Sequence, residues 1–136
     1  MTSPSEETPP LKVLLTQLDW NLQWLHQMEK NERTDYYRDA ALQRFGFAFD
    51  SAVKCIRAAA EQRNRGCPSS EECFELAETL NWLPEGAEWR KLIQDHQALK
   101  SESEPRETDA VFDRLKSHRN ILKILFDRLV IVAQSS

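Results

Sequence analysis

The chain has 136 residues, of which 40% are hydrophobic and 29% are charged, and its formal net charge at pH 7 is −4. These values are ordinary for one globular domain, and they argue against non-specific nucleic-acid binding, which depends on basic patches. No apolar run approaches the roughly 20 residues that a membrane span needs. The acidic, proline-rich first residues do not resemble a secretory signal. We therefore expect a cytoplasmic protein that does not associate with a membrane.

The three cysteines are odd in number and lack the spacing of metal ligands: Cys55, Cys67 and Cys73. Free thiols are the usual state of cysteines in the cytoplasm. We therefore expect three reduced cysteines, no metal site and no cofactor.

We expect residues 1–10 to form a disordered lead and residues 11–133 to form a single all-α domain, an up-and-down bundle of three long and two shorter helices. The first long helix is predicted from about Pro10 to Lys30. Its leucines recur on one helical face: Leu11, Leu14, Leu15, Leu18, Leu22 and Leu25.

The opposite face of this first helix carries Val13, Trp20 and Trp24. Exposed aromatic side chains are enriched at the centres of protein interfaces. We therefore expect Trp20 and Trp24 to face a partner, and the alternative is simple burial under another helix.

The rest of the bundle is expected to cover a central helix over Arg38–Glu61. At about 100° per residue its large apolar side chains share one face, and flanking alanines allow a neighbouring helix to come close. Phe47 does not fit this pattern, because it points away from the apolar face among polar residues. We therefore place Phe47 with Trp20 and Trp24 as a candidate interface residue.

Capping signals suggest where the helices begin and end. Thr34 or Asp35 can serve as the N-cap of the central helix, and Gly66 is a natural end for it. Ser69 and Glu72 have the spacing of a capping box, which predicts a short helix that closes near residues 81–83. A second short helix is predicted from residues 84–86 to residues 96–99.

The last helix is predicted from about Thr108 to Ala133, where apolar residues alternate at steps of four and three. His118 lies on this stripe, and we expect a core histidine held by one hydrogen bond. From Ile121 to Val132 additional apolar residues occupy the other faces, which predicts burial on several sides or a dimer seam. Together with the exposed aromatic residues, this excess of apolar surface predicts a homodimer.

Arg38 lies in the first turn of the central helix, on the apolar face, and so reaches over the rim of the core. A guanidinium in such a place needs a carboxylate or a phosphate as its partner. Asp95 is the expected partner in a rim salt bridge, and contact with an anion or nucleotide is the alternative.

A set of residues in the central helix keeps fixed spacings: Arg38-Asp39-Ala40, Gln43-Arg44-Phe45, Phe47, Phe49, Asp50, Ala52 and Lys54. At these spacings the stretch resembles the second helix of the nucleotidyltransferase substrate-binding proteins, which are small helical bundles related to the HEPN domains. Such proteins are typically encoded beside a minimal nucleotidyltransferase and associate with it. The resemblance covers about Tyr36 to Leu129.

The HEPN-like ribonucleases carry an Arg-Asn pair followed by a histidine, and this motif is not intact here. Asp95 matches the acidic residue before the pair, His96 stands in place of the arginine, Gln97 in place of the asparagine, and Ser101 in place of the later histidine. The resemblance therefore implies a protein without catalytic residues. A diverged ribonuclease that uses His96 as an acid or base is the alternative.

The resemblance implies a non-catalytic accessory subunit that binds a small nucleotidyltransferase, either to present its substrate or as its target in a toxin–antitoxin-like pair. The expected substrate or nucleotide contacts are Arg38, Asp95, His96 and Gln97. A plain helical interaction module with no link to nucleotides is the remaining hypothesis.

Overall fold

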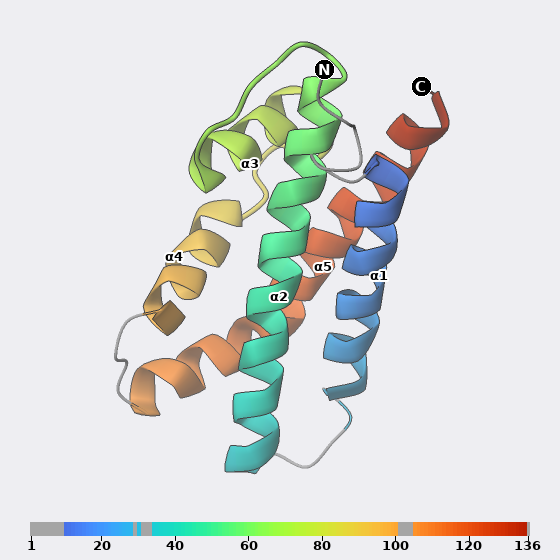
Figure 1. Cartoon of the computed structure of the whole chain (residues 1–136). Helices are drawn as coiled ribbons and strands as arrows, with labels where there is room; N and C mark the ends of the chain where they lie inside the picture. Colours follow the sequence, from blue (N-terminus) through green and yellow to red (C-terminus); the bar gives the residue numbers. More distant parts are fainter. Residues whose placement is uncertain (1–9, 29, 31–33, 101–104, 136) are drawn as a thin grey trace, which may run out of the picture.

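The computed structural model describes residues 10–28, 30, 34–100 and 105–135. Over these residues the chain forms five α-helices and no strand, which confirms the predicted all-α bundle of three long and two shorter helices (Figure 1). The helices are α1 (Leu11–Met28), α2 (Asp35–Glu61), α3 (Ser70–Thr79), α4 (Trp89–Lys100) and α5 (Pro105–Ser135). The predicted lead lies outside the described residues, apart from Pro10.

The three long helices pack against one another, and the two short helices complete the bundle (Figure 1). α1 and α2 run in opposite directions, and α5 runs antiparallel to α1 and packs against both. α3 and α4 pack against α2 and together occupy the position that a fourth long helix would take. The return from α2 to α5 is therefore made by two helices instead of one.

The predicted apolar faces of α1 and α2 are the ones that the structure buries. All six leucines of the α1 stripe are buried, as are the large apolar residues of α2: Leu42, Phe45, Phe49, Val53 and Ile56. Small residues on α2, such as Ala48, Ala52 and Ala59, are fully buried. Short side chains at these positions let neighbouring helices approach α2 closely.

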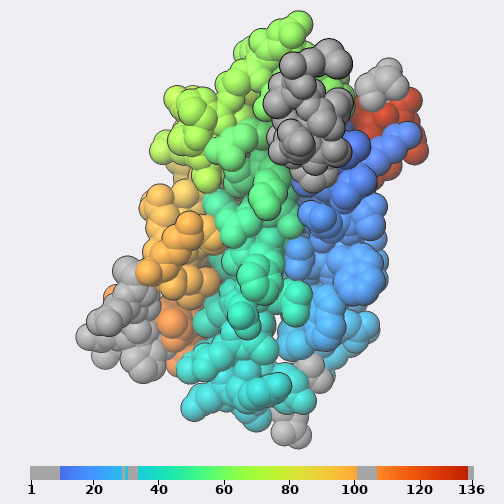
Figure 2. Space-filling model, viewed as in Figure 1, coloured from blue at the N-terminus to red at the C-terminus, as the bar shows by residue number. Residues whose placement is uncertain are grey.

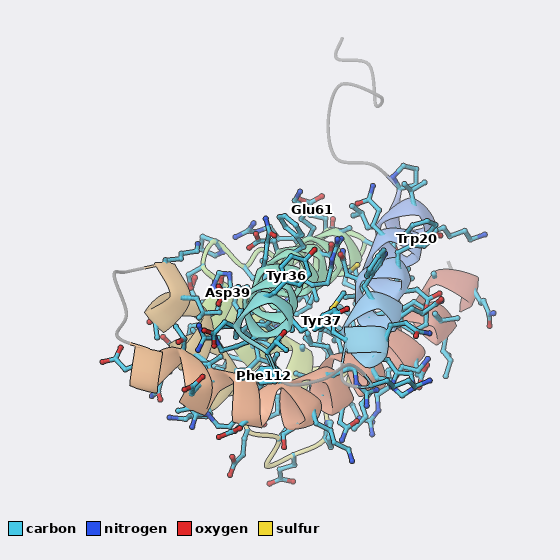
Figure 3. The ribbon with its side chains drawn as sticks, turned by 90° about the horizontal axis from the view of Figure 1, so that it is seen from below. Trp20, Tyr36, Tyr37, Asp39, Glu61 and Phe112 are labelled. Atoms are coloured by element: carbon cyan, nitrogen blue, oxygen red, sulfur yellow. A yellow bond between two sulfur atoms is a disulfide. The ribbon has the colours of Figure 1, made fainter. Side chains whose placement is uncertain are left out.

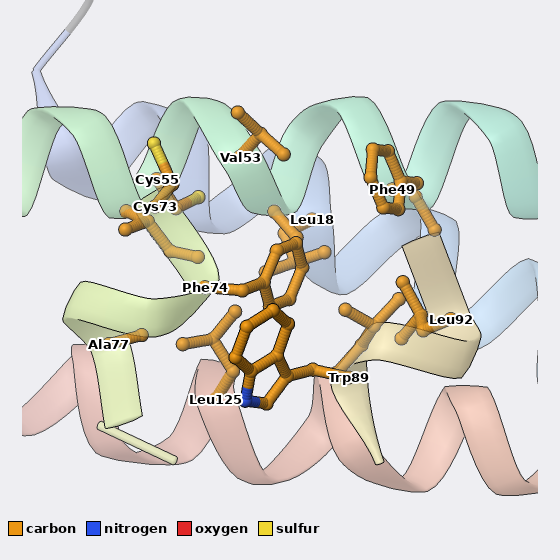
Figure 4. Close-up of a cluster of buried hydrophobic side chains, with 14 of the residues drawn as sticks. Leu18, Phe49, Val53, Cys55, Cys73, Phe74, Ala77, Trp89, Leu92 and Leu125 are labelled. Carbon is orange, nitrogen blue, oxygen red and sulfur yellow. The ribbon is translucent and has the colours of Figure 1, made fainter. Parts of the chain in front are cut away.

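A column of stacked rings crosses the middle of the bundle (Figure 4). The rings of Phe49 and Phe74 are 5.7 Å apart at 29°, and those of Phe74 and Trp89 are 6.2 Å apart at 15°. The indole nitrogen of the fully buried Trp89 donates to Glu78 Oε2 at 3.2 Å. Because these rings come from α2, α3 and α4, the column ties the two short helices to the central one.

Asparagine, and not glycine, ends both α2 and α3. Asn64 and Asn81 adopt left-handed backbone conformations, with φ of 58° and 63°. The next amide in each case bonds back five residues, from Arg65 to the carbonyl of Ala60 and from Trp82 to that of Ala77. This is the pattern of a Schellman end. The prediction that Gly66 ends α2 is therefore wrong, because Asn64 reverses the chain two residues earlier.

The predicted helix starts are partly correct. Thr34 is the N-cap of α2 and accepts a hydrogen bond from the amide of Tyr37, and Ser69 and Glu72 form the predicted capping box of α3. α4, in contrast, begins at Trp89 and not near Pro84, because Gly86 takes a positive φ of 85° that interrupts the helix. α5 begins at Pro105, three residues before its predicted start.

Cys67 and Cys73 form a disulfide that closes the connection between α2 and α3. The expectation of three reduced thiols is therefore wrong for this pair. The capped first turn of α3 carries Cys73 back towards the preceding loop, and the two Cα atoms lie 4.9 Å apart, within the range that a disulfide spans. Cys55 remains a buried free thiol, and burial raises its pKa to about 12.

The second half of α5 is less buried than predicted. Ile124 and Ile131 are exposed, so burial within the bundle is wrong for these two residues, whereas Leu122, Leu125 and Leu129 are fully buried; a dimer seam stays a prediction. α5 packs against α1, α2 and α4, and these contacts leave part of its surface open. Among the described residues, no helix is long and apolar enough to cross a membrane.

Candidate functional site

Arg38 lies where the start of α2 meets the start of α5. Its Nη1 donates to Asp109 Oδ1 at 2.9 Å, and its Nε donates to Asp39 Oδ1 at 3.2 Å. The bond with Asp109, followed by that with Asp39, raises the pKa of Arg38. The predicted pair with Asp95 is therefore wrong. Because α5 begins earlier than expected, Asp109 falls in its second turn, beside the guanidinium.

Asp95 instead joins α4 to α5 through a buried carboxylate. Arg114 of α5 binds it in a bidentate manner, with distances of 2.7 Å from Nε to Oδ2 and 2.8 Å from Nη2 to Oδ1. His118 Nε2 lies 2.6 Å from Oδ2. Burial alone raises the pKa of Asp95, but the hydrogen bonds and charges of Arg114 and His118 outweigh it, and the pKa is lowered. The carboxylate therefore stays ionised.

His118 is a core histidine with one hydrogen-bond partner, as predicted. Its Nδ1 is buried and makes no hydrogen bond. A proton on Nδ1 would be a buried donor without an acceptor, which is costly. Burial lowers the pKa of His118, and the bond with Asp95 offsets this only in part. The ring is therefore neutral and donates from Nε2 to the carboxylate.

His96 is also buried, in the aromatic interior. Its ring stacks on Phe49 with centroids 3.8 Å apart at 14°, and its Nε2 lies 3.6 Å from Asp50 Oδ1. Burial lowers the pKa of His96, and the nearby Asp50 raises it by less. A ring held in this way has little contact with solvent, so a substrate has no open approach to it.

Gln97 lies on a different face of α4 from Asp95 and His96. It is exposed and lines a shallow cavity of about 240 Å³ with Arg90, Gln94 and residues of α3 and α4. The structure therefore does not bring Arg38, Asp95, His96 and Gln97 together as one open rim. Their contact with a substrate stays a prediction, and Ser101 lies outside the described residues.

The most exposed group of candidate residues is an aromatic patch on α1 and α2, which consists of Trp20, Trp24 and Phe47 with Arg44. Trp20 is 66% exposed, Trp24 41% and Phe47 46%. The guanidinium of Arg44 lies 4.8 Å from the ring centre of Trp24 and 5.5 Å from that of Phe47. Arg44 therefore bridges the two helices and holds two rings in place by cation–π contact.

The face formed by α1 and α2 is a broad surface of the molecule (Figure 2). Trp20 lies on α1 (Figure 3), and most of its side chain is exposed. Trp20, Trp24 and Phe47 are not buried under another helix of the bundle, so the alternative given for the two tryptophans is excluded. What they face outside the chain stays a prediction.

Sequence reasoning missed the partners that organise these sites: Asp109, Arg114 and the bridging role of Arg44. Two signals were present. Arg114 lies four residues before His118, which places both on one face of α5. Arg44 lies three residues before Phe47, so the two are also neighbours on one helix. Neither spacing identifies the residue on the second helix that completes the contact. Among the described residues, no cluster of His, Cys, Asp and Glu is arranged to hold a metal ion.

Comparison with known proteins defines the class of fold and nothing finer. No family model matches the sequence, and no curated protein matches it. A protein from Thermus thermophilus with a known crystal structure has a similar fold, with a TM-score of 0.75 and 22% identity; the similarity covers 82% of this chain and 98% of the Thermus chain. At this identity the likeness shows the fold alone, a similar arrangement of the backbone over nearly the whole of the second protein.

Proposed function

We propose that this protein is a non-catalytic accessory subunit that associates with a small nucleotidyltransferase and forms a homodimer through the aromatic patch. The patch is the observation that carries the proposal, because two tryptophans and a phenylalanine beside an arginine have the composition of an interface centre. The resemblance of the α2 residues supports the choice of a nucleotidyltransferase as the partner.

The surroundings of His96 support a role without catalysis. An acid or base must come within hydrogen-bond reach of the proton that it transfers. His96 is buried against Phe49, and Asp95 is occupied by Arg114 and His118. We therefore favour the accessory role over a diverged ribonuclease.

The homodimer is tested by light scattering at micromolar concentration, where we expect about twice the chain mass of 15.9 kDa. Trp24→Ser and Phe47→Ser should shift the protein towards the monomer, because each removes a ring at the proposed interface. Tyr36→Ser is the matched control, since Tyr36 is an exposed aromatic residue outside the patch. A monomeric wild type, or dimers that persist in both patch variants, would show that the aromatic patch is not the dimer interface.

The nucleotidyltransferase partnership is tested by co-purification of the full chain with a minimal nucleotidyltransferase encoded beside it. Arg38→Ala should then weaken the complex if the rim near α5 contacts an anionic substrate. If Arg38 is a binding residue, the Arg38→Ala variant should lose the bound nucleotidyltransferase and keep the melting temperature of the wild type. Failure of wild-type protein to retain the enzyme would favour a plain interaction module.

We propose that the protein is cytoplasmic, and this location predicts the redox state of Cys67 and Cys73. Cellular thiols keep most cytoplasmic cysteines reduced. Trapping of free thiols in the cell, followed by mass measurement, should therefore find this pair reduced there, with the disulfide of the structure forming only after the protein leaves the cell. Recovery of the pair as a disulfide would place the protein in an oxidising compartment instead.

A further inference from the structure

The outer side of α1 carries a second stripe of residues, on the face opposite the buried leucines. Among the described helices only α2 and α5 pack against α1, so this side is left open. The stripe advances by steps of four and three residues, which is the spacing of a seam that packs against another helix. We call it the outer seam of α1, and all of its members are exposed: Val13, Gln17, Trp20, Trp24 and Gln27.

No charged side chain belongs to the outer seam, although 29% of the residues in the chain are charged. The titratable residues of this part of α1, Asp19 and His26, line a cavity shared with Arg119 of α5 instead. Depletion of charged residues is typical of the core of a protein interface. The outer seam therefore matches a partner surface that is also uncharged.

The C-terminal half of the outer seam contains a hole of the kind that receives a side chain from another helix. A shallow cavity of about 340 Å³ is lined by Trp20, Gln23, Trp24 and Gln27. These are residues i, i+3, i+4 and i+7 of one helix, and four residues of one helix surround each inserted side chain in knobs-into-holes packing. Because two of the four are tryptophans, the hole favours an apolar side chain.

The N-terminal half of the outer seam supplies such a side chain. Val13 is 46% exposed and is the aliphatic member of the seam. The centre of the hole lies about ten residues further along α1, which is about 16 Å at the rise of an α-helix. The inserting residue and the hole therefore lie on one face, at a fixed separation. Two copies of α1 that run in opposite directions place each Val13 in the hole of the other copy.

We propose that the outer seam of α1 packs antiparallel against the outer seam of a second copy, with Val13 of each copy inserted between Trp20 and Trp24 of the other. This packing rests on the proposed homodimer, and it adds the helix, the direction and the register of the contact. A two-fold interface uses the same surface on both subunits, and an uncharged face that carries both the inserting residue and the hole is complementary to itself.

Disulfide cross-linking of cysteine variants of the full chain tests the direction and the register. A mixture of Val13→Cys and Gln23→Cys should form a cross-linked dimer under mild oxidation, because Gln23 borders the hole that residue 13 enters. Val13→Cys alone should not cross-link, since the two copies of residue 13 lie about 16 Å apart in this packing. Tyr36→Cys mixed with Gln23→Cys is the matched control, because Tyr36 is exposed and lies outside α1.

The wild type gives the background from the natural cysteines. Absence of a cross-link between residues 13 and 23, cross-linking of Val13→Cys with itself, or an equal yield from the control mixture would overturn the proposed packing.

A charge on the inserted side chain gives a second test. Val13→Glu should weaken the dimer by about tenfold or more, because the carboxylate would lose its water between two indole rings. Val13→Ile should keep the dimer. Gln94→Glu adds the same charge at an exposed position on α4 and is the matched control. Light scattering over a concentration series measures dissociation, and thermal unfolding verifies that each variant is folded. A dimer that withstands Val13→Glu would overturn this packing and leave the homodimer standing, whereas a monomeric wild type would overturn both.

Discussion

The buried carboxylate of Asp95 is the residue on which the contact between α4 and α5 depends most. Arg114 and His118 both bind it, and all three are therefore coupled. The sequence predicts a rim pair between Asp95 and Arg38, whereas in the structure each binds a different partner. Asp95 therefore lies ionised inside the bundle, whereas Arg38 lies nearer the surface.

Asp95→Asn should lower the free energy of unfolding by about 1.5–3 kcal/mol, because it weakens the charge-assisted hydrogen bonds with Arg114 and His118 but keeps the shape of the side chain. Urea denaturation measures this loss. Asp109→Asn, which alters the more exposed pair with Arg38, is the control and should cause a much smaller loss. Equal effects of the two changes would mean that the Asp95 network contributes no more than a surface pair.

The two buried histidines predict a loss of stability in mild acid. Burial lowers the pKa of both His96 and His118 in the folded state. The unfolded chain therefore binds protons first as the pH falls below about 6.5, and stability that is present above this pH is lost. Thermal unfolding at pH 7.5 and pH 5.5 tests the direction. His118→Gln keeps an N–H donor for Asp95 but does not titrate, so it should reduce the difference between the two temperatures.

At the scale of the helices, the asparagine ends of α2 and α3 give a further prediction. Asn64 holds a left-handed conformation that costs most residues about 1 kcal/mol or more and costs glycine little. Asn64→Ala should therefore destabilise the protein by about 1 kcal/mol, and Asn64→Gly should be neutral or slightly stabilising. Chemical denaturation of both variants makes the comparison. An alanine variant as stable as the glycine variant would contradict the assignment of this helix end.

The helices themselves were largely predictable from the sequence, because each apolar face is a local pattern. The leucines of α1 and the capping box of Ser69 and Glu72 needed no knowledge of the fold. The residue that ends α2 and the start of α4 were not predicted, since Asn64 and Gly86 act through backbone angles that the spacing of apolar residues does not reveal.

The sites were less predictable, because their partners lie far apart in the sequence. Asp95 and Arg114 are separated by 19 residues, and Arg38 and Asp109 by 71. Each helical pattern shows which way a side chain points, but the choice between several acidic partners depends on how the helices are arranged. The exposure of Trp20, Trp24 and Phe47 was predictable in part, since each lies away from the apolar face of its helix.

At the scale of the whole molecule, the Cys67–Cys73 bond is a cross-link with a measurable effect. It closes a loop with a sequence separation of six residues, for which loop closure predicts a contribution of about 2 kcal/mol. Dithiothreitol should therefore lower the melting temperature of the wild type. The double variant Cys67→Ala and Cys73→Ala should melt below the oxidised wild type, close to the reduced wild type, and should not respond to dithiothreitol. A wild type that is insensitive to reduction would show that the bond does not constrain the unfolded chain.

The four tryptophans divide into two pairs whose fluorescence reports on different events. Trp20 and Trp24 lie in solvent on the aromatic patch, whereas Trp82 and Trp89 are buried. Iodide in the solution can reach only the first pair, so quenching of that emission reports whether a partner covers the patch. Emission from the second pair shifts to longer wavelength when water enters the core. One protein without any added dye can therefore distinguish association from unfolding in the same cuvette.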